Sequence, residues 1–126
     1  MPRTAVVPTA FSRTAKVVQQ AGTTIDATLV PNGVVITPDF PLEELVVQVT
    51  NTFAGAKIVT VQSGSNPPAL SAGQGDMTGS QAQNEVAYYG PFESARFRQT
   101  GAEPGLHVDF EAATTGTIRA FRMPRA

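Results

Sequence analysis

The one histidine of the chain lies in a segment whose residue types could support metal or acid–base chemistry. In "LHVDFEA" (106–112), the alternation expected of a β-strand places His107, Asp109 and Glu111 on one face and the apolar residues on the other. Imidazole and carboxylate groups bind metals and transfer protons. This face is therefore a candidate metal or acid–base site.

Arginines elsewhere offer a structural explanation for the same carboxylates. If "SARFRQ" (94–99) is a strand with its apolar residues inward, Arg96 and Arg98 point outward, and a register that keeps both apolar faces inward pairs them with the acidic face. "TIRAFRM" (117–123) adds Arg119 to the same surface if Ile118 is inward. The sequence thus predicts a salt-bridge ladder, in which each exposed pair contributes about 0.2–1 kcal/mol and mainly fixes register. Its members are Arg96, Arg98, Asp109, Glu111 and Arg119. A metal site or a contact patch for a partner remain alternatives.

A glycine-rich stretch, "LSAGQGDMTGSQ" (70–81), raises the question of phosphate binding. A phosphate-binding loop needs a strand before it and a helix after it, so that free N–H groups point at the anion. The prolines of "GSNPPAL" (64–70) argue against the strand, no helical pattern follows, and the lysine of the nucleotide-binding motif is missing. We expect a flexible surface loop and no cofactor.

No other arrangement of residues indicates catalysis. A serine or threonine nucleophile needs a base, and the only histidine has no serine near it in sequence. Glu43 and Glu44 are adjacent and diverge to opposite faces as a strand begins. With no cysteine, disulfides and thiolate metal sites are excluded. We predict no catalytic residue, no metal and no enzyme.

The bulk properties describe a domain without a general affinity for polyanions. The chain has 126 residues, and 9 basic residues against 10 acidic ones give a net charge of −1. We therefore expect no specific nucleic-acid binding and no membrane binding. The first residues lack an apolar run of the length of a signal peptide or a membrane span, so we expect the protein to be made in the cytoplasm.

The fold class follows from short apolar alternations separated by 11 glycines and 10 prolines. We predict an all-β fold: a single antiparallel β-sandwich of jelly-roll or immunoglobulin-like type over residues 17–126, preceded by an extended N-terminal arm over residues 1–16. "ELVVQVT" (44–50) and "KIVTVQ" (57–62) are expected to form a hairpin. Further strands are expected in "AKVVQQ", "TIDATLV", "VVIT", "EVAYYG", "SARFRQ", "LHVDFEA" and "TIRAFRM".

Several apolar residues have no place in the predicted core. Phe11 lies in the arm, Phe53 at the tip of a turn, and Phe121 and Met123 on the outward side of the last strand. Such residues fit a molecule that buries part of its surface against neighbours, and an extended arm can add a strand to a neighbour's sheet edge. The predicted partner-binding residues are Arg3, Val6, Val7, Phe11, Arg13, Phe53, Phe121 and Met123.

Residues 34–125 resemble a family of small proteins from tailed bacteriophages and prophages of actinobacteria. The resemblance rests on "ELVVQVTNTFAGAKIVTVQSGSNPPALSAGQGDMTG", "GPFESARFRQTG", "LHVDFEAATTGTIRAF" and "RMPR", with "NPPAL", "GQGD" and "GPFESARF" as its most recognisable pieces. These proteins are similar to capsid decoration, or auxiliary head, proteins. The resemblance implies a structural protein of the virion that binds the major capsid protein on the outer capsid surface, reinforces the lattice and self-associates, as a homotrimer in this class.

The alternative is a tail or baseplate module that binds host-surface carbohydrate. Sugar binding favours a platform of exposed aromatic rings, and the chain has no tryptophan and only the adjacent Tyr88 and Tyr89. The capsid role is therefore the leading hypothesis.

Overall fold

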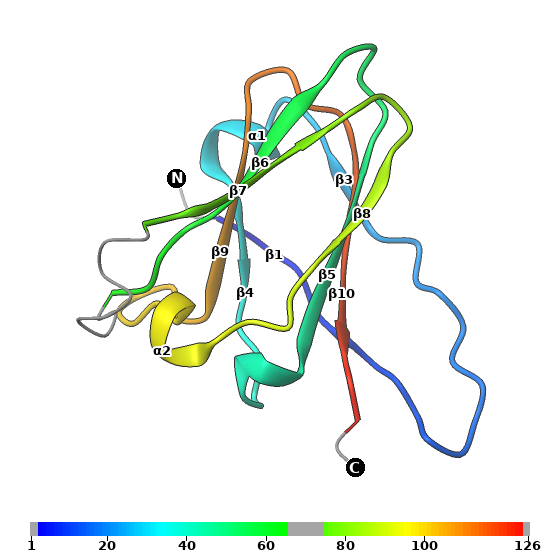
Figure 1. Cartoon of the computed structure of the whole chain (residues 1–126), viewed down its shortest axis with the longest axis vertical. Helices are drawn as coiled ribbons and strands as arrows, with labels where there is room; N and C mark the ends of the chain where they lie inside the picture. The colour runs from blue at the N-terminus through cyan, green and yellow to red at the C-terminus, as the bar shows by residue number, and fades with distance from the viewer. Residues whose placement is uncertain (1–2, 66–74, 125–126) are drawn as a thin grey trace.

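The computed structural model describes residues 3–65 and 75–124, which form two β-sheets and three short helical turns (Figure 1). Sheet A contains, in spatial order, β1 (Thr4–Ala5), β4 (Val34–Ile36), β9 (Leu106–Phe110), β6 (Lys57–Val61) and β7 (Met77–Gln81). Sheet B contains β2 (Thr9–Ala10), β10 (Gly116–Arg122), β5 (Leu45–Asn51) and β8 (Val86–Tyr89), and β3 (Thr23–Ile25) also pairs with β10. The helical turns are α1 (Leu29–Asn32), η1 (Leu42–Glu44) and α2 (Ser94–Phe97). The prediction of a β-rich chain is confirmed.

The antiparallel pairs are nested in the sequence. β6 pairs with β7, β5 with β8, β4 with β9 and β3 with β10, so the strands follow the order of one long hairpin whose arms are distributed over two sheets. Additional pairs, β5 with β10 and β6 with β9, join these arms within each sheet. Strand partners are thus far apart in the chain except at β6–β7.

One hydrophobic core lies between the sheets and takes side chains from both. The predicted alternation is confirmed: in β9 the apolar residues are buried and His107 and Asp109 are half-buried on the outer face. Ile118 and Ala120 of β10 point inward in the same way. The core is one cluster that combines sheet A residues (Val34, Ile36, Val59, Val61, Leu106, Val108 and Phe110) with sheet B residues (Leu45, Val47, Val49, Ile118 and Ala120).

The first residues do not form a separate arm. β1 pairs with β4 and β2 pairs with β10, both in parallel, so the segment crosses from the edge of sheet A to the edge of sheet B. Val6 between them belongs to the core. The sheets are therefore mixed, and the expectation of a purely antiparallel fold with a free arm over residues 1–16 is wrong. Pro8 lies outside the two-residue strands, so its missing N–H group leaves the pairing intact.

The expected hairpin between residues 44–50 and 57–62 is also wrong, although both strands exist. β5 already has β10 on one side and β8 on the other, so β6 continues in sheet A. The buried Asn51 holds the crossing: its Nδ2 donates to the carbonyl of Gln81 (2.9 Å) and of Gly55 (3.1 Å), and its Oδ1 accepts from the Phe53 N–H (3.0 Å). These hydrogen bonds give the polar groups at the crossing their partners, and the chain forms no tight hairpin turn between β5 and β6.

The segment 94–99 begins with a helical turn, not a strand. The carboxylate of Glu43 accepts hydrogen bonds from the Ser94 N–H (2.9 Å) and hydroxyl (2.8 Å), which fixes the start of α2. Phe97 then packs edge-on against Phe92, with ring centroids 5.6 Å apart. The contact between Ser94 and Glu43, which is far away in the chain, therefore outweighs the strand-like alternation of "SARFRQ".

Two further sequence expectations change in detail. Residues 16–21 lie in an exposed loop, and in "TIDATLV" the short β3 is followed by α1. Of the glycine-rich stretch 70–81, residues 70–74 lie outside the described part of the chain, and residues 77–81 form β7 at the edge of sheet A. The expected surface loop is therefore in part a strand.

Candidate interaction surface

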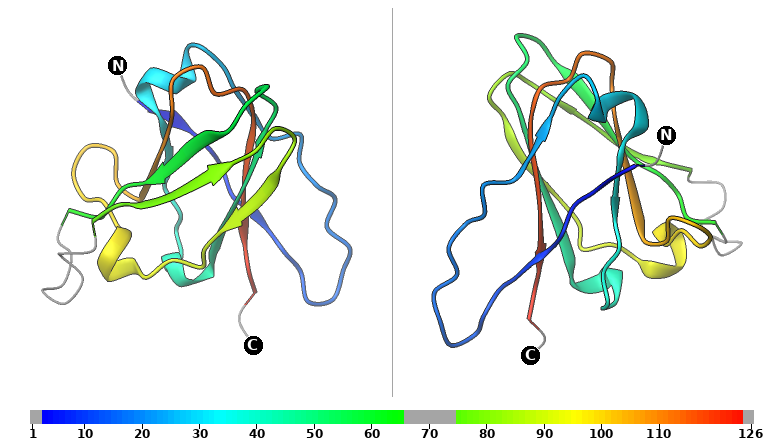
Figure 2. Two further views of the ribbon diagram at one scale, coloured as in Figure 1. Left: turned by 45° about the horizontal axis from the view of Figure 1, so that its top comes forward. Right: turned by 180° about the vertical axis from the view of Figure 1, so that it is seen from behind.

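A loop formed by residues 11–22 packs beside the outer face of sheet B and is fastened to it at both ends. It leaves the body of the molecule beside β10 and returns at β3 (Figure 2). At its start, the rings of Phe11 and Phe121 stack with centroids 5.0 Å apart, and the Phe11 N–H donates to the carbonyl of Arg122 (2.9 Å). Phe121 points outward, as predicted, but Phe11 covers it and leaves it 6 % exposed. The expectation that Phe121 is an exposed contact residue is therefore corrected, whereas Phe11 stays 38 % exposed.

Arg119 fastens the other end of the loop. Its guanidinium donates to the main-chain carbonyls of Gln20 (2.7 Å) and Ala21 (3.0 Å). Gly22, with φ of +86°, permits this approach, because a Cβ there would lie 3.0 Å from Cγ of Arg119. The loop is therefore held by a side chain of the last strand.

Arg119 also starts a polar row across sheet B. The guanidinium donates to Oε1 of Gln48 (3.0 Å), and Nε2 of Gln48 donates to the Tyr88 hydroxyl (2.9 Å). These residues are direct neighbours in the register of β10, β5 and β8. The row orients Tyr88, whose ring remains 63 % exposed.

Apolar side chains surround this row. A small hollow of about 230 Å³ is lined by Phe11, Val17, Val18, Gln19, Gln48, Tyr88 and Phe121. Val18 is 68 % exposed at its rim. We name the loop 11–22 together with the outward residues of β10, β5 and β8 the sheet-B surface. Sequence reasoning missed Val17, Val18, Gln48 and Tyr88 as members, because only the loop brings them together with Phe11.

Charge is distributed unevenly along the chain, and this distribution is a second feature that distinguishes the sheet-B surface. All 10 acidic residues lie between Asp26 and Glu111, whereas residues 1–25 and 112–126 carry only basic charges. Pairing of β2 and β3 with β10 brings residues 9–10 and 23–25 beside residues 116–122 in sheet B, whereas Arg3 lies on the sheet A side. Exposed Arg13 and Lys16 lie in the loop itself. The loop side of sheet B therefore carries basic side chains.

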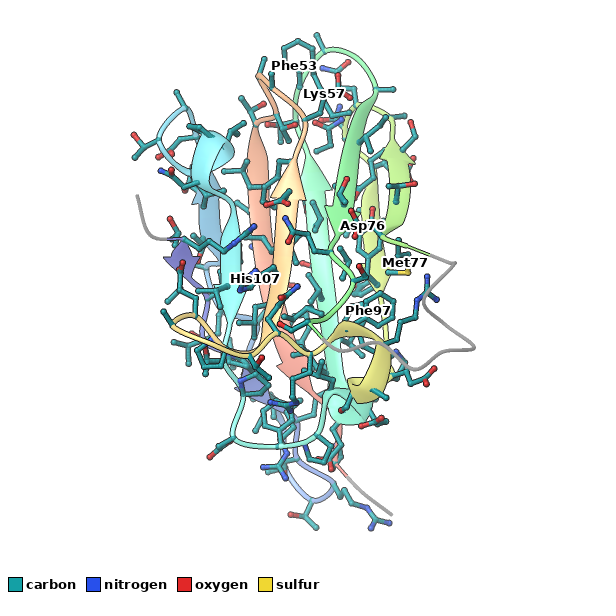
Figure 3. All side chains as sticks on the ribbon, turned by 90° about the vertical axis from the view of Figure 1, so that its left-hand side faces the viewer. Phe53, Lys57, Asp76, Met77, Phe97 and His107 are labelled. Atoms are coloured by element: carbon teal, nitrogen blue, oxygen red, sulfur yellow. The ribbon has the colours of Figure 1, made fainter. Side chains whose placement is uncertain are left out.

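The outer face of sheet A differs, since it is predominantly polar. Its outward residues in β9, β6 and β7 are His107, Asp109, Thr60, Thr78 and Ser80, with Ile58 as an exposed apolar residue. Figure 3 views this side and shows His107 on β9. Nε2 of His107 lies 2.7 Å from the carbonyl of Glu103.

The predicted salt-bridge ladder does not form. Arg96 and Arg98 lie in and directly after α2, where they donate to the carbonyls of Gly75 (3.4 Å) and Phe40 (3.3 Å). Arg119 is in the other sheet. The carboxylates have different partners: Asp109 pairs with Arg3 (2.6 Å), and Glu111 pairs with Lys57 (3.4 Å). The ladder fails because its arginines are on a helical turn and in the opposite sheet.

The remaining predicted contact residues are scattered. Arg3 binds Asp109 on the sheet A side, Val6 is buried, and Val7 is 83 % exposed where the chain crosses between the sheets. Phe53 stands at one end of the molecule with the Lys57 ammonium 4.3 Å from its ring centroid (Figure 3). Met123 is exposed just after β10, and its N–H donates to the carbonyl of Glu44 (2.7 Å). Only Phe11, Arg13 and Phe121 therefore belong to the sheet-B surface.

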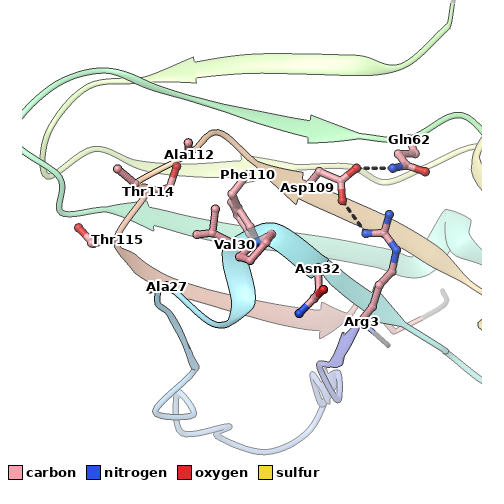
Figure 4. A pocket seen from close by; sticks show the side chains of 12 residues that line it. Arg3, Ala27, Val30, Asn32, Gln62, Asp109, Phe110, Ala112, Thr114 and Thr115 are labelled. Carbon is pink, nitrogen blue, oxygen red and sulfur yellow. Dashed lines mark hydrogen bonds and ion pairs between the residues drawn. The ribbon is translucent and has the colours of Figure 1, made fainter. Parts of the chain in front are cut away.

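A larger groove of about 930 Å³ lies between α1 and the turn after β9 (Figure 4). Arg3 and Gln62 both donate to the carboxylate of Asp109 at one end of it, and Val30 and Phe110 form its apolar wall. Arg3 and Asp109 neutralise each other, so this end presents no net charge. The Arg3–Asp109 pair connects the N-terminal segment to β9.

In residues 3–65 and 75–124, no group of three histidine, cysteine, aspartate or glutamate residues is arranged to hold a metal ion. None of the helices described is long and apolar enough to cross a membrane. Comparison with protein-family models gives no match, and comparisons with curated proteins and with solved structures give none either.

Proposed function

We propose that the chain is a structural, non-enzymatic protein of a tailed bacteriophage that binds the outer surface of the capsid, in contact with the major capsid protein, and reinforces the lattice. The observation that carries the proposal is the sheet-B surface, where an apolar hollow and basic loop residues lie on a rigid sheet. Such a surface suits a broad protein contact better than a drug-sized ligand, because its hollow of about 230 Å³ is smaller than the roughly 300–1,000 Å³ of an ordinary ligand pocket. The resemblance to decoration proteins supplies the identity of the partner and the location on the virion.

The proposed fold type is an eight-stranded jelly-roll β-sandwich, to which β1 and β2 are added. The support is the nesting of β3–β10, β4–β9, β5–β8 and β6–β7, which divides one long hairpin between two facing sheets. Jelly rolls occur in viral capsid proteins and in lectins, so this likeness of fold is an analogy that fits either hypothesis. The arrangement favours the jelly roll over the immunoglobulin-like alternative.

The test is rebinding to capsids that lack this protein. Purified wild-type protein is expected to decorate them regularly, visible as added density by electron microscopy, and absence of added density would contradict the proposal. The informative variant is Val18→Asp, which places a charge in the sheet-B surface; we expect at least a ten-fold loss of capsid affinity.

Ile58→Asp is the matched control, because Ile58 is also an exposed apolar residue but lies on sheet A. It is expected to bind like the wild type. Loss of binding in Ile58→Asp with retention in Val18→Asp would show that sheet A faces the capsid instead.

The carbohydrate alternative takes its support from the exposed ring of Tyr88, which a hydrogen-bonded row holds in place. A sugar could stack on this ring. Glycan-array binding that is lost in Tyr88→Ala, together with no binding to capsids, would favour the tail module.

A further inference from the structure

The free edge of β8 offers main-chain groups for pairing. The Asn51 N–H donates to the carbonyl of Glu85 (3.1 Å), and antiparallel pairs alternate between bonded and non-bonded positions. Ala87 and Tyr89, opposite Val49 and Val47, therefore bond to β5. It follows that the N–H and C=O groups of Val86 and Tyr88 point away from β5, on the side where the described part of the chain places no further strand.

β8 lacks the features that usually protect an edge strand. Its sequence, Val86-Ala87-Tyr88-Tyr89, has no charge and no proline, and it consists mainly of β-branched and aromatic residues that favour strands. The other edges differ: β1 and β2 are two residues long, β3 is three residues long, and β7 contains Gly79, which weakens a strand. β8 is thus the edge best suited to accept another strand.

The pattern on this edge is complementary to itself. In an antiparallel pairing centred on Ala87, Val86 of one copy lies opposite Tyr88 of the other, and each such pair exchanges both of its hydrogen bonds. Both side chains lie on the outer face, so each pair also brings a β-branched residue against an aromatic ring, a favourable cross-strand combination. Shifting the register would leave some of these main-chain groups unused. The uncharged strand introduces no repulsion at the axis.

We propose that two copies of this chain associate through β8, in antiparallel pairing about a two-fold axis at Ala87. The pairing joins the two B sheets into one continuous sheet and places the two sheet-B surfaces side by side. A two-fold contact closes on itself, so the expected product is a dimer and not the homotrimer that the resemblance implies. The edge is short, and the association is therefore expected to be reversible and concentration-dependent. The proposal does not depend on capsid binding.

The first measurement is the mass of the purified protein in solution across a concentration range, by sedimentation, combined with amide hydrogen exchange. We expect a monomer–dimer equilibrium in which the Val86 and Tyr88 amides become protected as concentration rises. The Ala87 and Tyr89 amides, bonded to β5, are expected to exchange slowly at every concentration. A monomer at all concentrations, a trimer, or unprotected Val86 and Tyr88 amides in a dimer would overturn the proposal.

The second measurement uses matched variants. Val86→Lys adds charge at the edge and is expected to weaken dimerisation at least ten-fold, whereas Thr78→Lys, at the exposed edge of sheet A, is expected to have no effect. Because the chain has no cysteine, Ala87→Cys provides a single thiol at the proposed axis, where a non-bonded antiparallel pair brings Cα atoms within disulfide range. Mild oxidation is expected to cross-link Ala87→Cys but not Thr78→Cys. Equal cross-linking of both variants, or a dimer unaffected by Val86→Lys, would place the contact elsewhere.

Discussion

Individual side chains in this molecule form hydrogen bonds with main-chain groups at the connections between strands. Asn51 binds two turns at once, and Gln81 beside it donates to the carbonyls of Val49 (3.0 Å) and Glu85 (3.1 Å) and accepts from the Tyr89 hydroxyl (2.6 Å). Burial raises the pKa of Tyr89, with the nearby charge of Glu85 acting in the same direction. The side-chain amides of Asn51 and Gln81 are polar groups inside an apolar region, so they stabilise the fold only when their hydrogen bonds are complete.

Asn51→Ala is expected to destabilise the fold by about 2–4 kcal/mol, since it removes the side-chain partner of the buried Gln81 carbonyl and of part-buried main-chain groups of Phe53 and Gly55. Urea unfolding measures the change. Thr50→Ala, the adjacent outward position, serves as control and is expected to change the free energy of unfolding by less than about 1 kcal/mol. Equal effects of the two substitutions would show that the amide network contributes nothing specific.

Glu43 gives the molecule a defined response to acid. The Ser94 N–H, followed by the Ser94 hydroxyl, lowers the pKa of Glu43 below its ordinary value of 4.5. Because the folded pKa is the lower one, this stabilisation is complete above about pH 4.5 and is lost as the pH falls through the folded value.

Ser94→Ala removes the hydroxyl and keeps the N–H, so the pKa of Glu43 is expected to rise part of the way toward 4.5. A carboxyl titration followed by NMR measures it, with Ser80→Ala as control. An unchanged pKa in Ser94→Ala would mean that the hydroxyl does not stabilise the carboxylate.

At the scale of elements, the sequence predicts which face of a strand is buried much better than it predicts the strand's partner. Alternation in β5, β9 and β10 depends only on neighbouring residues, and those faces are confirmed. The partner of β5 and the helical nature of α2 depend on residues about fifty positions away, such as Glu43 for Ser94. For the same reason Phe11 and Phe121 could each be selected as unusual, whereas their stacking could not be predicted.

The N-terminal strands provide a direct test of the revised role of residues 1–16. Val6→Ala is expected to cost about 2 kcal/mol of stability, because Val6 lies in the core between β1 and β2. Val7→Ala is the control: its side chain is exposed, so a change below about 0.5 kcal/mol is expected. Thermal unfolding distinguishes the two, and a Val6→Ala protein as stable as the wild type would indicate an extended arm that contributes nothing to the core.

For the molecule as a whole, the two sheets present different outer faces, and the basic residues Arg13, Lys16 and Arg119 lie on the sheet-B surface. This asymmetry distinguishes one side of the protein, although its net charge is only −1. The net charge, which comes from composition alone, therefore does not reveal the uneven distribution of basic side chains that results when β2, β3 and β10 pair.

The asymmetry predicts that capsid binding is sensitive to salt. Raising the ionic strength from about 0.05 to 0.5 M is expected to weaken binding several-fold, because screening shortens the reach of the loop charges. Lys16→Glu is expected to weaken it further at low salt, whereas Thr78→Glu on the sheet A side is not. Equal sensitivity of the two variants would indicate a response to net charge alone.

The parallel pairing of β2 with β10 also has a consequence for biosynthesis. Thr9 and Ala10 are synthesised before their partners Phe121 and Arg122, which follow more than a hundred residues later in the chain. The central β6–β7 pair can form early in translation, but the loop that carries Phe11 and Val18 has no anchor until Arg119 and Phe121 have emerged. A chain that ends before Arg119 would therefore lack both anchors of this loop. The order of the sheet-B surface thus depends on synthesis of the chain through β10.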